Sequence, residues 1–134
     1  MNIIIVDDNK SFRAALKHLL EKNKDYEIIC EADNGIQALE LLNSYTPELV
    51  LMDIEMPIMD SIKAIKLMLT ENNQIKFIAI TEYSDKVYLD EIMGAGFHAC
   101  VLKSDVFDEI DAIIEAVCND KYTFPKGIML NDPL

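Results

Sequence analysis

Short apolar segments alternate along the chain with longer segments in which apolar residues recur at helical spacing. Five of the short segments are nearly continuous in apolar residues: 2–6, 27–31, 48–52, 76–80 and 99–102. Strands buried on both faces of a parallel sheet have this continuous apolar character, whereas half-exposed strands alternate between apolar and polar residues. The pattern therefore predicts five strands of a parallel sheet.

The segments between these strands have the apolar spacing of amphipathic helices. In the first of them, one face of the helix carries Phe12, Ala15, Leu16, Leu19 and Leu20. Their spacing of i, i+3, i+4, i+7 and i+8 is that of a helix with a single buried stripe. Further helices are expected over about 35–45, 59–71, 85–95 and 106–117.

Polar residues at the ends of these segments predict where the helices begin and end. Asn34, with Gln37 three residues later, has the pattern of a capping box. Residues 84–85 can cap the fourth helix, and Gly96 can close it. Ser104 or Asp105 is the expected N-cap of the last helix.

Strand and helix alternate five times, and right-handed crossovers between parallel strands place helices on both faces of the sheet. The sequence thus predicts an α/β fold, a doubly wound (βα)5 three-layer sandwich. We assign residues 1–119 to this domain. Residues 120–134 have no apolar periodicity and contain three Pro or Gly residues, so we expect a tail or linker there.

The composition fits one globular domain with an acidic surface. The chain has 134 residues, of which 51% are hydrophobic, and a formal net charge of −12. Such a chain is a poor match for non-specific nucleic-acid binding or for acidic membrane surfaces. We find no membrane-span pattern and no signal-sequence pattern, and the three cysteines have no metal-ligand spacing. We therefore expect a cytoplasmic protein that does not bind membranes.

Reactive side chains follow four of the five predicted strands. The first strand is followed by Asp7 and Asp8, the third by Asp53, the fourth by Thr81 and the fifth by Lys103. The carboxyl ends of parallel strands lie along one edge of an open sheet, so these side chains should converge in one crevice. Each residue alone would be an ordinary turn or surface residue, and only the ordered set favours a site.

The set has a definite chemistry. Three carboxylates at one edge repel each other unless their pKa values rise or a cation joins them. Oxygen-only donors suit a hard ion, and Mg²⁺ is the expected cofactor. One carboxylate can attack phosphorus, while a hydroxyl and an ammonium group provide partners for the phosphoryl oxygens.

The ordered motifs resemble the receiver domain of two-component response regulators, over residues 1 to about 119. The resemblance rests on four segments: 5–9 (IVDDN), 51–60 (LMDIEMPIMD), 80–81 (IT) and 101–103 (VLK). None of the four is specific alone, but their order and spacing are. The resemblance implies a flavodoxin-like fold with strand order 2-1-3-4-5.

The resemblance also implies roles for the residues that would handle phosphate. Asp53 is the expected acceptor of a phosphoryl group from the phosphohistidine of a sensor histidine kinase. Lys103 is expected to pair with the phosphate, and Thr81 to donate a hydrogen bond to it once Asp53 is modified. The domain would then be a phosphorylation-switched signalling module that controls an output such as transcription, and not an enzyme.

The expected Mg²⁺ site combines carboxylates with one backbone group. By resemblance, Asp7, Asp8 and Asp53 hold the ion, together with the backbone carbonyl of Glu55. In the family, the positions of Glu55 and Tyr83 also border the phosphate and tune its hydrolysis.

Four positions depart from the family pattern. Cys100 stands where an aromatic switch residue is expected, and Glu82 follows Thr81 where a small residue is usual. Ser104 and Ser61 stand where Pro and Gly are common. Glu82 is the most consequential departure, because an inward-pointing carboxylate would obstruct the phosphate.

The resemblance implies partners as well. A kinase domain carrying the phosphohistidine is expected to dock on the first helix, around Phe12 and Ala15. A homodimer through the fourth helix, fifth strand and fifth helix would bring together acidic faces and would need Lys partners. Residues 103–105 (KSD) and 121–125 (KYTFP) resemble receivers of LuxR-type transcription regulators. DNA would then be bound only through an output domain absent from this chain.

Two other functions stay open at this point. Cys100 and Glu82 are compatible with a pseudo-receiver, an interaction module that no longer takes phosphate. A hydrolase of the aspartyl-phosphate type also uses an Asp after a buried strand. That class needs a second Asp two residues later and a following Thr or Ser, and Asp53 is followed by neither.

Overall fold

Five parallel strands form one sheet at the centre of the molecule. The computed structural model describes residues 1–55, 61–82 and 86–121. The strands are β1 (Asn2–Val6), β2 (Glu27–Ala32), β3 (Leu49–Asp53), β4 (Lys76–Thr81) and β5 (Ala99–Leu102). All neighbouring strands are parallel, and their order is β2-β1-β3-β4-β5. The predicted doubly wound fold and its strand order are confirmed.

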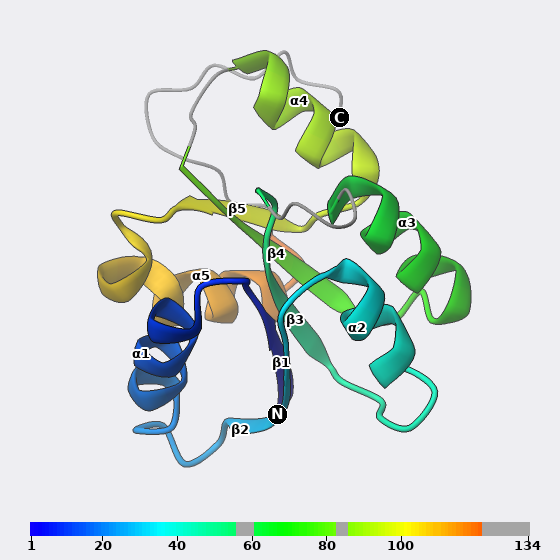
Figure 1. The fold of residues 1–134 in the computed structure, drawn as a ribbon. Coiled ribbons are helices and arrows are strands. Elements are labelled where there is room, and N and C mark those ends of the chain that lie inside the picture. The colour runs from blue at the N-terminus through cyan, green and yellow to red at the C-terminus, as the bar shows by residue number, and fades with distance from the viewer. Residues whose placement is uncertain (56–60, 83–85, 122–134) are drawn as a thin grey trace.

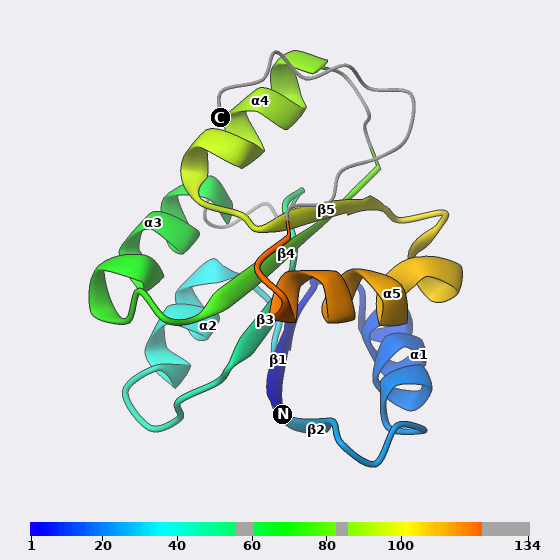
Figure 2. The same ribbon diagram turned by 180° about the vertical axis from the view of Figure 1, so that it is seen from behind.

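Helices cover both faces of the sheet and make three layers. The helices are α1 (Lys10–Leu20), α2 (Gly35–Leu41), α3 (Ser61–Glu71), α4 (Lys86–Ala95) and α5 (Val106–Cys118). Helices α1 and α5 lie on one face, and α2, α3 and α4 lie on the other (Figure 1). Figure 2 shows the same division from behind, with α5 packed beside α1.

The two faces of each central strand feed two separate cores. On β1, Ile3 and Ile5 belong to the core under α1 and α5, whereas Ile4 and Val6 belong to the core under α2, α3 and α4. This alternation follows from the two-residue period of a strand. Both sets of side chains are buried, which explains why β1 reads as a continuous apolar run.

Helix α2 begins as predicted but ends earlier than expected. The side chain of Asn34 accepts a hydrogen bond from the Gln37 backbone N–H at 2.9 Å, and the Gln37 side chain reaches back to the N–H of Asp33 at 2.8 Å. The helix ends at Leu41, so its expected extension to about Tyr45 is wrong. The chain tightens there through the i→i+3 bond from the Ser44 N–H to the Leu41 carbonyl at 3.1 Å.

Helix α5 begins directly after Asp105, as predicted, but without the expected capping hydrogen bond. Asp105 occupies the N-cap position, but its side chain makes no capping hydrogen bond, and its backbone is in the right-handed helical region. Two acidic residues, Asp108 and Glu109, lie in the first turn, where negative charge is favourable to the helix dipole. The predicted N-cap of α4 at residues 84–85 and the first residues of the third predicted helix lie outside the described residues.

Helix α5 ends where the predicted domain boundary falls. Asp120 takes a left-handed backbone conformation (φ 59°), and the Lys121 N–H bonds to the Ala116 carbonyl at 2.9 Å. These are features of a Schellman ending. The boundary at residue 119 stays a prediction, because residues 122–134 are not described. Within the described residues, no helix combines the length and apolar character needed to cross a bilayer.

Gly96 ends α4 as the sequence predicts, and the geometry at this residue requires glycine. Its φ of +112° is a conformation that other residues rarely adopt, and a Cβ added there would lie 2.6 Å from Leu69 Cδ1. A Cβ added at Gly94, two residues earlier in α4, would have nothing within 4 Å. Gly94→Ala is therefore a matched control for Gly96→Ala.

We expect Gly96→Ala to lower the free energy of unfolding by about 1–3 kcal/mol, because it adds backbone strain and a clash. Gly94→Ala should raise it by up to about 1 kcal/mol, since alanine is the better helix former. Urea unfolding followed by circular dichroism measures both changes. Equal midpoints for the two variants would contradict the geometry assigned to Gly96.

Candidate functional site

The strand register brings the reactive residues to one edge of the sheet. Val6 pairs with Met52, so Asp7 leaves β1 beside Asp53 at the end of β3. Thr81 pairs with Leu102, so Lys103 follows immediately beyond the end of β5. The backbone continues this pairing, because the Lys103 N–H donates to the Thr81 carbonyl at 2.7 Å. The carboxyl ends of four strands thus meet, as open α/β sheets require.

Three carboxylates lie close enough to share one cation. Asp7, Asp8 and Asp53 each offer an oxygen atom, and these atoms lie within 4.8 Å of one another. Asp7 and Asp53 are buried, while Asp8 is exposed. Hard oxygen donors at this spacing fit Mg²⁺, and Asp7 Oδ2 is buried without a hydrogen-bond partner among the described residues. The residues present therefore fit the expected ion.

Both buried carboxylates are oriented by their own loops. The Asn9 N–H donates to Asp7 Oδ1 at 2.7 Å, and the Glu55 N–H donates to Asp53 Oδ1 at 2.9 Å. In each loop the bond spans two residues, as in an Asx turn. Lys103 Nζ lies 3.4 Å from Asp7 Oδ2 and 3.6 Å from Asp53 Oδ2. One oxygen of each carboxylate is therefore held by backbone and the other faces the ammonium group.

Burial and neighbouring charges shift the protonation of this cluster. Burial raises the pKa of the Asp7 carboxyl, and the charge of Asp53 adds to the rise, against the Asn9 N–H and Lys103. Burial alone would lower the pKa of the Lys103 ammonium, but Asp53 and Asp7 reverse this effect and raise it. Lys103 therefore stays charged, while Asp7 is harder to ionise than an ordinary aspartate.

Lys103 is also fixed by an aromatic contact. Its Nζ lies 4.5 Å from the centroid of the Phe12 ring on α1, a cation–π distance. Phe12 packs edge-to-face on Phe107 of α5, with ring centroids 5.5 Å apart. The lysine is thereby directed from the end of β5 toward the carboxylates.

The hydroxyl of Thr81 is bound to Glu55 in this structure. Thr81 Oγ1 donates to Glu55 Oε1 at 2.6 Å, and the Glu82 backbone N–H donates to the same oxygen at 3.2 Å. Glu55 Oε2 is buried and has no hydrogen-bond partner among the described residues. Burial raises the pKa of Glu55, although the bonds from Thr81 and Glu82 oppose the rise. The Glu55 carboxylate thus accepts hydrogen bonds from two donors at the edge of the site.

The structure places the four departures from the family pattern. The side chain of Glu82 is exposed, so the acid that reaches into the site is Glu55. Cys100 is a buried core residue, and burial raises the pKa of its thiol to about 12. Ser61 is buried at the start of α3, where its hydroxyl donates to the Asp53 carbonyl at 2.9 Å. Ser104 is exposed, and Tyr83 lies outside the described residues.

One residue at the site was not predicted from the sequence. Arg13 is buried in α1, and its Nη1 donates to the backbone carbonyl of Asp7 at 2.5 Å. The signal was present, because Arg13 falls in line with Leu16 and Leu20 on the buried face of α1. A charge in an apolar stripe requires a buried partner, which spacing alone does not name.

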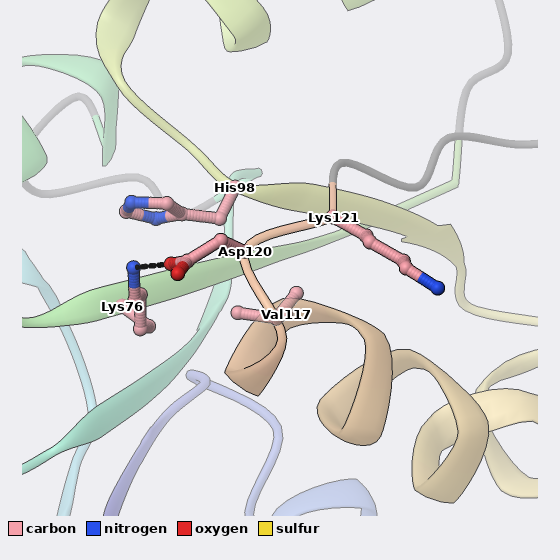
Figure 3. A pocket seen from close by; sticks show the side chains of 5 residues that line it. All are labelled: Lys76, His98, Val117, Asp120 and Lys121. Carbon is pink, nitrogen blue, oxygen red and sulfur yellow. Dashed lines mark hydrogen bonds and ion pairs between the residues drawn. The ribbon is translucent and has the colours of Figure 1, made fainter.

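A second hollow lies at the opposite edge of the sheet, where β4 begins and α5 ends. It is lined by Lys76, His98, Val117, Asp120 and Lys121 (Figure 3). Lys76 Nζ pairs with Asp120 Oδ1 at 2.7 Å, and His98 Nδ1 accepts a hydrogen bond from the Phe77 N–H at 3.0 Å. The Lys121 side chain points away from this ion pair. These groups therefore do not converge on one point as ligands do.

Comparisons with known proteins agree with the fold. Residues 3–115 match the family described as the response regulator receiver domain. The chemotaxis protein CheY of Bacillus subtilis is 34% identical over 115 residues, which are 86% of this chain and 92% of CheY. The uncharacterized transcriptional regulatory protein YhcZ of Bacillus subtilis is 36% identical over 110 residues, 82% of this chain and 51% of YhcZ.

A solved structure agrees as well. The crystal structure of a LuxR-family DNA-binding response regulator from Staphylococcus aureus superimposes with a TM-score of 0.79 at 30% identity, over 87% of this chain and 97% of that one. The chain belongs to the response regulator receiver domain family. It spans about half the length of the first curated relatives that it matches, 48% of DegU from Brevibacillus brevis and 51% of YhcZ.

Without divalent cations, we expect Asp7→Asn to stabilise the folded domain near neutral pH. The pKa of Asp7 is raised above its ordinary 3.8 in the folded state. The wild type therefore loses stability as pH rises from about 3.8 through the raised pKa. The gain from Asp7→Asn should therefore shrink as pH falls toward about 4. Urea unfolding in EDTA at several pH values measures it.

Asp90→Asn, at an exposed position of α4, is the matched control and should show no such pH-dependent gain. An Asp7→Asn variant that is less stable than the wild type near neutral pH would show that the pair with Lys103 outweighs burial.

Proposed function

We propose that this chain is a phosphorylation-switched receiver in which Asp53 accepts a phosphoryl group from a kinase phosphohistidine in a Mg²⁺-dependent step. The observation that carries the proposal is the position of the Asp53 carboxylate. It lies within the cation-binding spacing of Asp7 and Asp8 and beside the Lys103 ammonium. This is the combination of nucleophile, metal ligands and cation that phosphoryl transfer uses.

The transfer exchanges one bond of phosphorus for another. A carboxylate oxygen of Asp53 forms the new bond to phosphorus as the bond to the kinase imidazole nitrogen breaks, and that nitrogen keeps the electron pair. Asp7, Asp8, Asp53 and the Glu55 carbonyl would hold Mg²⁺, which would supply neutralisation of the phosphoryl charge. Lys103 contributes a positive charge beside Asp7 and Asp53.

Thr81 is proposed to report the modification. In the unmodified chain its hydroxyl donates to Glu55, as does the Glu82 backbone N–H. A phosphoryl group on Asp53 offers stronger acceptor oxygens to the same donors. The switch is then an exchange of acceptors, from the Glu55 carboxylate to the phosphoryl oxygens. Such a contact, present only in the modified state, shifts the population of the active form.

The partners of this switch follow from its family. A sensor histidine kinase would dock beside the acidic cluster on α1, where Ala15 is exposed and Phe12 is half-buried next to Lys103. YhcZ is named as a transcriptional regulatory protein and CheY as a chemotaxis protein. For this chain we propose a transcriptional output of the LuxR type, with DNA bound through a separate output domain.

We expect Mg²⁺-dependent labelling of the wild type by acetyl phosphate and none of Asp53→Asn, because the variant lacks the nucleophilic carboxylate. Intact-mass spectrometry detects the added phosphoryl group, and EDTA should abolish it. Glu82→Gln is the matched control, since its side chain is exposed and the labelling should persist.

The competing functions give different results in the same experiment. A pseudo-receiver takes no label even with Mg²⁺, and label that persists in Asp53→Asn would place the acceptor elsewhere. A hydrolase of the aspartyl-phosphate type would release inorganic phosphate from a phosphate ester in steady turnover.

Glu55→Gln should raise the rate of labelling roughly three- to tenfold, because it removes a like charge beside the incoming phosphoryl group, an interaction of about 1 kcal/mol. Glutamine keeps the size of the side chain and an oxygen that can accept from Thr81. The comparison is with Glu82→Gln, which removes a charge that points to solvent. Equal rates for the two variants would contradict the role given to Glu55.

A further inference from the structure

Arg13 connects the acidic site to β2, the edge strand of the sheet. Its guanidinium donates through Nη1 to the Asp7 carbonyl at 2.5 Å and also pairs with Asp33 Oδ1 at 2.9 Å. Its Nε pairs with Glu31 Oε1 on β2 at 3.0 Å. Arg13 is buried, and its planar fork contacts the loop after β1, strand β2 and the loop after β2 at once.

We propose that Arg13 is a positioning residue of the magnesium site, acting through the peptide bond between Asp7 and Asp8. This inference rests on the proposed function. The carbonyl that Arg13 holds belongs to that peptide unit, which is planar. A fixed carbonyl direction therefore fixes the backbone nitrogen and Cα of Asp8, from which its side chain extends.

Asp8 needs such support more than its two neighbours do. Each of the Asp7 and Asp53 carboxylates is held by a backbone N–H and faces Lys103. Among the described residues, the Asp8 side chain has no hydrogen bond or ion pair, and it is exposed. Its position near the other two carboxylates depends on the backbone that Arg13 holds.

Glu31, the partner of Arg13 on β2, also pairs with Lys17. Lys17 Nζ, one turn further along α1, pairs with Glu31 Oε2 at 3.3 Å. Lys17 thus contacts the same glutamate as Arg13, carries the same charge and lies on the same helix. Its pairing is with β2 and not with Asp7, so it provides a matched control for charge near the site.

A role through charge and a role through positioning predict opposite changes in Mg²⁺ affinity when Arg13 is removed. A positive charge near a cation site repels the cation, so removing it should tighten Mg²⁺ binding on electrostatic grounds alone. Loss of a group that orients a metal ligand weakens binding, typically 10–100-fold. The direction of the change therefore separates the two explanations.

The experiment is a titration of Mg²⁺ into the full chain by isothermal calorimetry, for wild type, Arg13→Met, Arg13→Lys and Lys17→Met. We expect Kd to rise roughly tenfold or more for Arg13→Met. Arg13→Lys keeps the charge but lacks the fork, and its Kd should also rise. Lys17→Met should stay within about twofold of wild type or bind slightly more tightly.

Wild-type or tighter binding by Arg13→Met overturns the inference, and so does an equal loss in Lys17→Met. Circular dichroism in EDTA checks the fold of each variant. If Arg13→Met does not fold, Arg13→Lys decides, and a wild-type Kd there overturns the inference. A wild type that binds no Mg²⁺ would instead contradict the proposed function itself, and this inference with it.

Discussion

The close approach of the buried carboxylates of Asp7 and Asp53 is the constraint on which the rest of the site depends. Two like charges in a buried position are costly, and the raised pKa of Asp7 expresses that cost. The fold offsets it with one backbone N–H for each carboxylate and with the ammonium of Lys103 between them. A balance of this kind is sensitive to any added charge, as the proposed switch requires.

The sheet makes this balance possible because it is rigid and apolar on both faces. Parallel pairing sets the ends of β1, β3, β4 and β5 side by side, and the two cores hold that register. The polar groups then lie at one edge, on the last residues of β3 and β4 and on the loops that follow β1 and β5. Around this edge, Glu55 and Arg13 satisfy donors and acceptors that would otherwise lie unpaired in a buried place.

The sequence alone carried most of the fold and much of the site. Continuous apolar runs and helical stripes are local signals. They located all five strands and the alternation of strands and helices along the chain. The residues after each strand could then be brought together by topology alone, which is why Asp7, Asp8, Asp53, Thr81 and Lys103 were recognised as one set. The structure brings these residues to one edge, and their chemical roles stay proposals.

Tertiary structure decided what local patterns do not encode. The contact of Arg13 with the Asp7 carbonyl, the bond from Thr81 to Glu55 and the outward direction of Glu82 depend on side-chain directions across separate elements. The early end of α2 was likewise invisible to apolar spacing. Amino-acid type and period determine which faces are buried, since burial is a property of whole segments. The partner of a single buried polar group is set only when distant segments have packed, because hydrogen bonds depend on position to within fractions of an ångström.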